Sequence, residues 1–282
     1  MAHQITGIDH VAVAVADLTE ANRRFARLGF IPSPAGSHPE WGTANRCLMF
    51  ARDYVELLAA TGAGAGAERV RAHLAARGEG MMGVALGSRD ATRSAESLNR
   101  AGVAAGRPTA LSRQLDGPEG EVTPRFTVVD LPPEATPGLP AFLCQHLTPE
   151  LLRRPEWLAH PNGAIGIVSL TVLVEQPEAL MGIYDKVFGP GAATPTDEMV
   201  TVHSGRGLLF LVTADGFDHL HPDMVMDLPS PPALVALSIA VEDLDLAHGL
   251  LKANGVRCVR KGGHLEVDPA EVLGIGLEFV ER

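Results

Sequence analysis

Four stretches of the chain repeat one pattern of apolar and polar positions. Each opens with an apolar, β-branched run typical of a buried strand, at residues 8–15, 82–86, 167–174 and 234–241. A short polar residue or a proline then stands where a helix begins, and helically spaced apolar positions follow it. Twelve residues after that position comes a glycine, which ends the helix because it adopts a left-handed conformation at little cost. The four pairs are Asp17 with Gly29, Asp90 with Gly102, Pro177 with Gly189, and Asp243 with Gly255.

The remainder of each repeat holds further candidate strands. A short apolar segment follows the glycine in three repeats, at residues 30–31, 103–104 and 256–258. The helix starts are separated by 73, 87 and 66 residues, and the shared pattern around them argues against coincidence. The sequence therefore predicts an α+β protein built from four βαβββ modules. Two longer candidate strands complete each module, at residues 45–50 and 54–59, 125–129 and 141–145, 201–203 and 208–212, and 264–267 and 276–280.

Three segments lie outside this repeat and indicate how the modules are connected. Residues 61–67 are a Gly/Ala run that predicts a linker between the first two modules. Residues 130–140 are rich in proline and predict a turn-containing insertion in the second module. Residues 150–164 predict a short helix and a turn between two halves. We therefore expect modules one and two in residues 1–147, a connecting segment in 148–164, and modules three and four in 165–282.

Composition narrows the class of function. The formal net charge is −11, with 23 Lys and Arg against 34 Asp and Glu, so we expect no nucleic-acid-binding surface. The three cysteines lie far apart, which argues against a disulfide framework and a thiolate zinc site. We see no signal peptide and no apolar run of about 20 residues, so we expect a cytoplasmic protein without a membrane partner. The expected partner is a small-molecule substrate, and a homodimer is a state that the repeat allows.

Several motifs resemble those of one superfamily. The opening Gly7-Ile-Asp-His10-Val is similar to the first strand of a module in the vicinal oxygen chelate superfamily, which contains glyoxalases, bleomycin-resistance proteins and extradiol dioxygenases. Asp53-Tyr-Val-Glu56-Leu is similar to the last strand of such a module, and residues 41–46, 142–150 and 160–164 resemble four-module glyoxalase-like domain proteins. The resemblance implies two curved mixed β-sheet half-barrels flanked by helices. It also implies that His10 and Glu56 are metal ligands.

Strand periodicity gives a separate reason to single out His10 and Glu56. His10 shares a strand face with Ala12 and Ala14, small residues that leave room for a ligand, while valines occupy the other face. Glu56 lies between apolar neighbours within a strand, where a carboxylate is costly unless it binds a metal ion or an arginine. A buried structural histidine is the alternative interpretation of His10. We predict that both bind a divalent metal ion (Zn, Fe, Ni or Mn) and that Glu56 also takes part in catalysis by proton transfer.

The second module departs from this pattern. Gly83 stands at the position of His10, so the first strand of this module supplies no ligand. Its last strand ends in Gln145 and His146, which face opposite sides, so only one of them should enter the site. His146 is the better donor for Zn²⁺, Fe²⁺ or Ni²⁺, whereas Gln145 better matches the family's carboxylate or amide position. We predict His146 as the third ligand and Gln145 as a substrate contact, with the reverse assignment left open.

The second half of the chain has lost most of these residues. Leu170 and Ala236 stand at the histidine position, and Phe210 lies near the glutamate position of the third module. Glu278 survives alone and is expected to be a remnant or an ion-pair partner. The two histidines of residues 219–221 lie in a predicted loop; metal binding is one interpretation of them, but we expect them to be solvated. The working site is therefore expected in the first half.

Other polar residues are candidates for binding the substrate. His38, Trp41 and Asn45 are expected to line the mouth of the cleft. Arg113 and Arg125 are candidates for an anionic substrate group, because a guanidinium binds a carboxylate through two parallel hydrogen bonds.

Three functions compete on these grounds. The first is a glyoxalase-like, metal-dependent lyase or isomerase that acts on a small substrate with vicinal oxygens, the metal serving as a Lewis acid. The second is an extradiol-type Fe(II) dioxygenase, although those enzymes place the metal in the second pair of modules. The third is a metal-free protein that binds a small aromatic molecule or an antibiotic. We favour the first, which makes the protein an enzyme.

Overall fold

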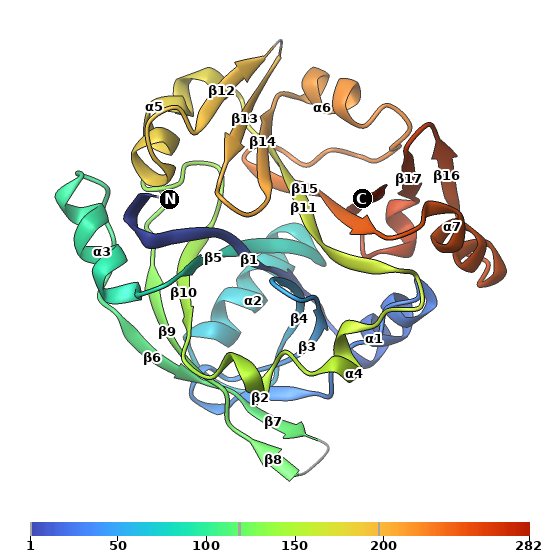
Figure 1. The fold of residues 1–282 in the computed structure, drawn as a ribbon, viewed down its shortest axis with the longest axis horizontal. Coiled ribbons are helices and arrows are strands. Elements are labelled where there is room, and N and C mark those ends of the chain that lie inside the picture. Colours follow the sequence, from blue (N-terminus) through green and yellow to red (C-terminus); the bar gives the residue numbers. More distant parts are fainter. Residues whose placement is uncertain (1, 118–119, 197) are drawn as a thin grey trace.

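The computed structural model describes residues 2–117, 120–196 and 198–282, which form two curved mixed β-sheets flanked by helices. One sheet has ten strands and draws all of them from residues 5–146, and the other has eight and draws them from residues 164–281. Figure 1 shows the two halves side by side, the first in blue and green and the second in yellow to red. The predicted fold class, α+β with paired modules forming two half-barrels, is confirmed.

The first half contains two modules and the helices between their strands. Its elements are η1 (Ala2–Gln4), β1 (Ile5–Ala14), α1 (Leu18–Arg27), β2 (Gly36–His38), η2 (Pro39–Trp41), β3 (Thr43–Met49), β4 (Tyr54–Ala60), α2 (Ala65–Arg77), β5 (Gly80–Ser88), α3 (Ala91–Arg100), β6 (Thr109–Ser112), β7 (Gln114–Gly117), β8 (Gly120–Val122), β9 (Arg125–Asp130) and β10 (Ala141–His146).

Two short helices, η3 (Pro149–Leu151) and α4 (Pro155–Leu158), connect this half to the second. The elements of the second half are β11 (Ala164–Leu173), α5 (Pro177–Phe188), β12 (Ala193–Thr196), β13 (Met199–His203), β14 (Leu208–Val212), α6 (Ala214–Leu220), β15 (Ala233–Val241), α7 (Leu244–Ala253), β16 (Cys258–Lys261), β17 (His264–Val267), η4 (Pro269–Glu271) and β18 (Gly276–Glu281). No described helix is long and apolar enough to cross a membrane.

The predicted helix starts lie where the module pattern places them, with one shift. Asp17, Asp90 and Asp243 are N-caps whose carboxylates accept hydrogen bonds from backbone N–H groups of the first helical turn. In the third module the N-cap is Gln176 and Pro177 occupies the first helical position, so this module is one residue out of the predicted frame. The four glycines that follow the helices, Gly29, Gly102, Gly189 and Gly255, all have positive φ, between 65° and 110°.

The short strand after the helix begins later than the apolar pattern predicts in the first two modules, at Gly36 and Thr109, and only two residues late in the fourth, at Cys258. Phe30 is buried, but β2 begins only at Gly36, because Pro32 and Pro34 lack the N–H group that a strand ladder requires. The predicted linker 61–67 also runs into α2, which begins at Ala65. The apolar pattern does not predict α2 itself, since its few buried residues do not form a continuous apolar face.

Strand register identifies which residues of the two halves correspond. In the first sheet His10 lies opposite Ala85, directly after a bulge that follows Ile8. In the second sheet Ser169 lies opposite Ser238, directly after a bulge that follows Ile167. The counterpart of His10 in the third module is therefore Ser169, and the prediction of Leu170 is wrong by the one-residue shift of α5.

The two halves share one hydrophobic core. A continuous cluster of buried side chains runs from Ile5 to Phe279, and the ring of Phe30 contacts that of Phe279 at 5.9 Å between centroids. Polar contacts also join the halves: the buried Asp53 Oδ1 accepts a hydrogen bond from the backbone N–H of Ile167 at 2.8 Å. The halves therefore pack against each other as parts of one folded unit.

Candidate active site

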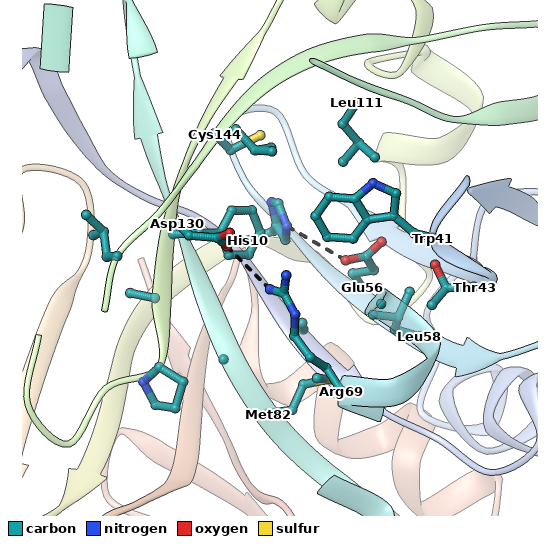
Figure 2. A pocket seen from close by; sticks show the side chains of 18 of the residues that line it. His10, Trp41, Thr43, Glu56, Leu58, Arg69, Met82, Leu111, Asp130 and Cys144 are labelled. Carbon is teal, nitrogen blue, oxygen red and sulfur yellow. Dashed lines mark hydrogen bonds and ion pairs between the residues drawn. The ribbon is translucent and has the colours of Figure 1, made fainter. Parts of the chain in front are cut away.

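The first sheet encloses a cavity of about 400 Å³. Residues of β1, β3, β4, β5 and β10 line it, and the proline-rich insertion at residues 131–140 supplies part of its wall. Most of the lining is apolar, which is typical of a small-molecule site. Figure 2 shows His10, Trp41 and Glu56 converging on the same space. The polar lining includes His10, His38, Asn45, Glu56 and Arg113.

His10 is held in one orientation by its neighbours. Its ring stacks on Tyr54 with centroids 4.3 Å apart and contacts the edge of Phe142 at 5.5 Å. Its Nδ1–H donates to Asp9 Oδ1 at 2.9 Å, which fixes the tautomer and leaves the lone pair of Nε2 free. Nε2 faces Glu56 Oε2 at 3.7 Å, as the dashed line in Figure 2 shows. The free nitrogen is therefore directed at the carboxylate in the cavity.

Glu56 is ionised although it is buried. Its Oε1 accepts a hydrogen bond from the Asn45 side-chain amide, and its side chain is in the cavity wall. Burial by itself raises a carboxyl pKa, yet the pKa of Glu56 lies below its ordinary value. In the acidic range where Glu56 titrates, the protonated rings of His10 and His38 oppose the effect of burial, and the Asn45 amide and Arg113 add to them. The result is a carboxylate, not a carboxylic acid, beside His10 at neutral pH.

Asp9 belongs to the site although strand alternation places it on the opposite face from His10. The bulge between Ile8 and His10 breaks that alternation, so the Asp9 carboxylate reaches two histidines. Its Oδ1 accepts from His10 Nδ1 and from His146 Nε2, each at 2.9 Å. A carboxylate within an otherwise apolar strand was the only sequence signal for this role.

His146 and Gln145 do not enter the cavity. His146 contacts Asp9 rather than Glu56, and its buried Nδ1 has no hydrogen-bond partner among the described residues. Gln145 lies on the other face of β10, where its Oε1 accepts from the N–H of Ala91 at the start of α3. The fold therefore brings neither residue to the space between His10 and Glu56.

The ligand position of the second module is occupied by Phe142. In the first module Glu56 pairs in parallel with Ala12. In the second module Phe142 pairs in parallel with Ala85, which corresponds to Ala12 in the 73-residue repeat. Together with Gly83 at the histidine position, Phe142 leaves the second module without a side chain that can bind a metal there.

The first-half cavity does not fit a complete catalytic metal site. A catalytic zinc normally has three protein ligands, and among the described lining residues only His10 and Glu56 lie close enough together to share one, since His38 forms no compact group with them. The described residues contain no third His, Cys, Asp or Glu that forms with these two a group whose donor atoms all lie within 4.8 Å. Asp9, Cys144 and His146 do form such a group, but Asp9 already accepts from both histidines and burial raises the pKa of Cys144 well above its ordinary value.

A buried guanidinium lines the same cavity as Glu56. Arg113 is 3 % exposed; it donates to Cys47 Sγ at 3.2 Å and to Ser33 Oγ at 3.3 Å, while its Nε has no partner among the described residues. The backbone of Gly36 makes room for it, since a Cβ there would lie 2.1 Å from Arg113 Nε. Arg113 thus supplies a buried positive charge to the cavity lining, as expected for a group that binds an anion.

The other predicted substrate contacts are divided between the cavity and the surface. His38 lines the cavity, with Nδ1 hydrogen-bonded to Thr43 Oγ1 at 3.1 Å, and burial lowers its pKa so that it is neutral. Trp41 also lines the cavity, with the guanidinium of Arg69 at 5.3 Å from its ring. Arg125 is exposed and lies outside the cavity lining.

Sequence comparison supplies the family. The model of the glyoxalase-like domain matches residues 8–188. The chain belongs to this family. The match covers the whole first half, including His10 and Glu56, and the start of the second, and it confirms the resemblance to the vicinal oxygen chelate superfamily. No curated protein matches this chain.

Solved structures share its fold at low sequence identity. A hypothetical protein from Staphylococcus aureus is similar with a TM-score of 0.68 and 10% identity, over 98% of this chain and 99% of that one. A triple mutant of 4-hydroxymandelate synthase from Streptomyces coelicolor is similar with a TM-score of 0.61 and 16% identity, over 99% and 93%. A xylose isomerase-like TIM barrel/4-hydroxyphenylpyruvate dioxygenase fusion protein gives 0.59 and 15%, over 100% of this chain and 50% of that one. These likenesses establish the architecture, not the reaction.

Proposed function

We propose that the first-half cavity binds a small, partly apolar organic acid and that His10 and Glu56 transfer a proton on it, as in an isomerase or a lyase. The observation that carries the proposal is the His10–Glu56 pair, 3.7 Å apart in a cavity of about 400 Å³. A hydrogen bond orients each side chain: Asp9 accepts one from His10, and Asn45 donates one to Glu56. Such support is typical of groups that must hold one geometry during catalysis.

The pair is suited to general acid–base chemistry. His10 Nε2 has a free lone pair and can accept a proton from a carbon or hydroxyl group of the substrate. The Asp9 carboxylate stabilises the imidazolium that results, because it accepts the Nδ1–H on the opposite side of the ring. Glu56 is the second proton carrier: because it is ionised and faces the same nitrogen, it can receive the proton that Nε2 has taken and, once protonated, return it to the substrate.

The lining indicates the class of substrate. Arg113 supplies a buried positive charge in the cavity lining, which suits a carboxylate. Leu58, Met82, Leu111 and Phe126 surround the remaining space and suit an apolar or aromatic body. A small aromatic or branched 2-hydroxy or 2-oxo acid has both features, together with the vicinal oxygens expected from the resemblance.

The metal-dependent form of this activity is the second candidate. The orientation of His10 and Glu56 by Asp9 and Asn45 favours it, because metal-binding side chains are usually supported in this way. A bound divalent ion would act as a Lewis acid on the substrate oxygens. The missing third ligand in the first half counts against it, so we rank it below metal-independent proton transfer.

Binding and proton transfer can be measured separately. Mandelate and related 2-hydroxy acids, and 2-oxo acids with a hydrogen on C3, serve as probes, with calorimetry for binding and NMR in D₂O for exchange of the C2 hydrogen of the hydroxy acids or the C3 hydrogen of the oxo acids. Wild type should bind and exchange, whereas Glu56→Gln should bind and not exchange. Glu281→Gln, an exposed residue at the end of β18, is the matched control.

Two outcomes would change the conclusion. Binding without exchange in the wild type would make the protein a binding protein. Exchange that is lost with chelator, restored by a divalent metal and abolished by His10→Ala would establish the metal-dependent form.

A further inference from the structure

The second half contains a polar centre that the first half lacks. A row of four polar side chains crosses consecutive strands of the second sheet, where the register places Ser169 on β11 opposite Ser238 on β15, then Glu278 on β18 and Glu266 on β17. All four are buried, with Glu266 and Glu278 only 6 % and 5 % exposed. Two glutamates that are direct cross-strand partners repel each other, so this arrangement is unfavourable without a compensating charge.

A histidine at the end of α6 lies close to the two glutamates. His221 is the C-cap residue of α6 and is 2 % exposed, so the expectation that it is a solvated loop residue is wrong. Its Nε2 and the Thr171 hydroxyl are 2.9 Å apart, and donation from Nε2–H leaves the lone pair of Nδ1 free. His221, Glu266 and Glu278 each offer a donor atom, and these three atoms lie within 4.8 Å of one another.

Two buried atoms of this group have no partner among the described residues. They are His221 Nδ1 and Glu266 Oε2. Buried polar atoms are rarely left without a hydrogen bond, and an unmet pair in one cluster indicates that something else occupies the space between them. Since one is a nitrogen acceptor and the other a carboxylate oxygen, a cation satisfies both.

We propose that His221, Glu266 and Glu278 bind a divalent transition-metal ion. One imidazole and two carboxylates are donors that Zn²⁺, Mn²⁺ and Fe²⁺ accept. Metal–ligand distances of about 2.0–2.2 Å place neighbouring donors about 3–4 Å apart, so only a small contraction of the cluster is needed. The two glutamates balance the charge of one divalent ion.

The neighbouring protein groups orient the two glutamates but do not fully neutralise their charge, which favours a bound cation. Glu278 accepts from Ser238 Oγ and from His264 Nδ1, each at 2.6 Å, which orients its carboxylate in the way that metal-binding carboxylates are oriented. His264 is largely exposed, and Lys261 pairs with Asp223 at 3.1 Å, so neither neutralises the buried pair fully. Burial, followed by the charges of Glu278 and Asp223, raises the pKa of Glu266 to about 7.

The bound ion would hold the end of α6 against β17 and β18. His221 is separated from Glu278 by more than fifty residues, and the ion would join its helix to the β17–β18 hairpin. This role is structural and does not depend on the reaction in the first-half cavity. Metal found in the purified protein would then belong to the second half.

The test uses the full-length chain after chelator treatment, titrated with Zn²⁺ and separately with Mn²⁺. Wild type should bind about one equivalent and melt roughly 5 °C higher at a metal concentration a hundredfold above Kd. Glu266→Gln should lose this stabilisation while remaining folded, and should melt no lower than wild type without metal, because it removes the repulsion with Glu278. Glu278→Gln should also lose it.

His10→Ala and Glu281→Gln are the controls, and both should keep the full metal response. The proposal is overturned if neither metal stabilises wild type, as expected if a shared proton joins the two glutamates instead. It is also overturned if Glu266→Gln keeps the response, or if His10→Ala abolishes it. The last result would place the metal in the first half and revive the metal-dependent form of the proposed reaction.

Discussion

The two halves have the same topology but keep their glutamate in opposite modules. In the first half Glu56 lies on the last strand of the first module, and Phe142 holds the corresponding place in the second. In the second half Phe210 pairs with Thr171 in the third module, and Glu278 pairs with Ser238 in the fourth. Each half has therefore kept one carboxylate at its centre and replaced the other with phenylalanine.

The partners of the two glutamates differ in kind. Glu56 faces a histidine from the same sheet and an apolar cavity, with Arg113 nearby. Glu278 faces a second glutamate and a histidine supplied by α6, and lies outside that cavity. One repeat thus produces a histidine–glutamate pair beside open space in the first half, and a compact group of one histidine and two glutamates in the second.

The largest expected effect separates the two centres by activity. Glu56→Gln should lower kcat by about 10²–10⁴-fold, because it removes one member of the proton-transferring pair while keeping its size. Glu278→Gln should leave kcat within about twofold. Steady-state kinetics on both variants measures this, and equal losses would mean that the halves are not functionally distinct.

Arg113 tests the proposal that the first-half cavity binds the carboxylate of an organic acid. Arg113→Met keeps the length of the side chain but removes the charge, and should weaken binding of an organic acid by about 10–100-fold. Calorimetry with the acid and with its uncharged amide measures the difference. Equal affinity of the variant and wild type for the acid would show that the carboxylate does not contact Arg113.

The residues that hydrogen-bond to His10 and to Glu278 allow a finer comparison of the two centres. Asp9→Asn weakens the support of His10, and Ser238→Ala removes a hydrogen bond to Glu278. We expect Asp9→Asn to lower activity by about 10–100-fold without changing metal binding, and Ser238→Ala to lower metal affinity by about tenfold without changing activity. Kinetics and metal titration on both variants check this, and crossed effects would show that the two centres are coupled.

Asp53 tests the contact between the halves through pH. Burial raises its pKa to about 6 from an ordinary value of 3.8, so the folded state holds this proton more tightly than the unfolded state. Asp53 therefore lowers stability as pH rises from about 4 to above 6. Asp53→Asn should be more stable than wild type by about 1–3 kcal/mol at pH 8, with the difference vanishing near pH 4. Denaturant unfolding at the two pH values measures it, and a variant that is less stable at pH 8 would contradict it.

The sequence by itself determined the repeat and the first-half pair. Apolar alternation, N-cap aspartates and helix-ending glycines are local signals, so they predicted four modules and most of their strands correctly. His10 and Glu56 were found through the resemblance of their strands to those of the superfamily, and strand periodicity supported them; both line the cavity. These features depend only on residues that are close together in the chain.

Only the tertiary structure decided what surrounds these residues. A bulge turned Asp9 toward His10, and strand register placed Phe142 where the end of β10 had suggested His146. The second-half centre joins residues from α6, β17 and β18, and no local pattern predicts that His221 folds over Glu278. Bulges and strand register depend on which strands pair with each other. Contacts between distant elements depend on how the two sheets pack. The local sequence pattern therefore predicts none of these features.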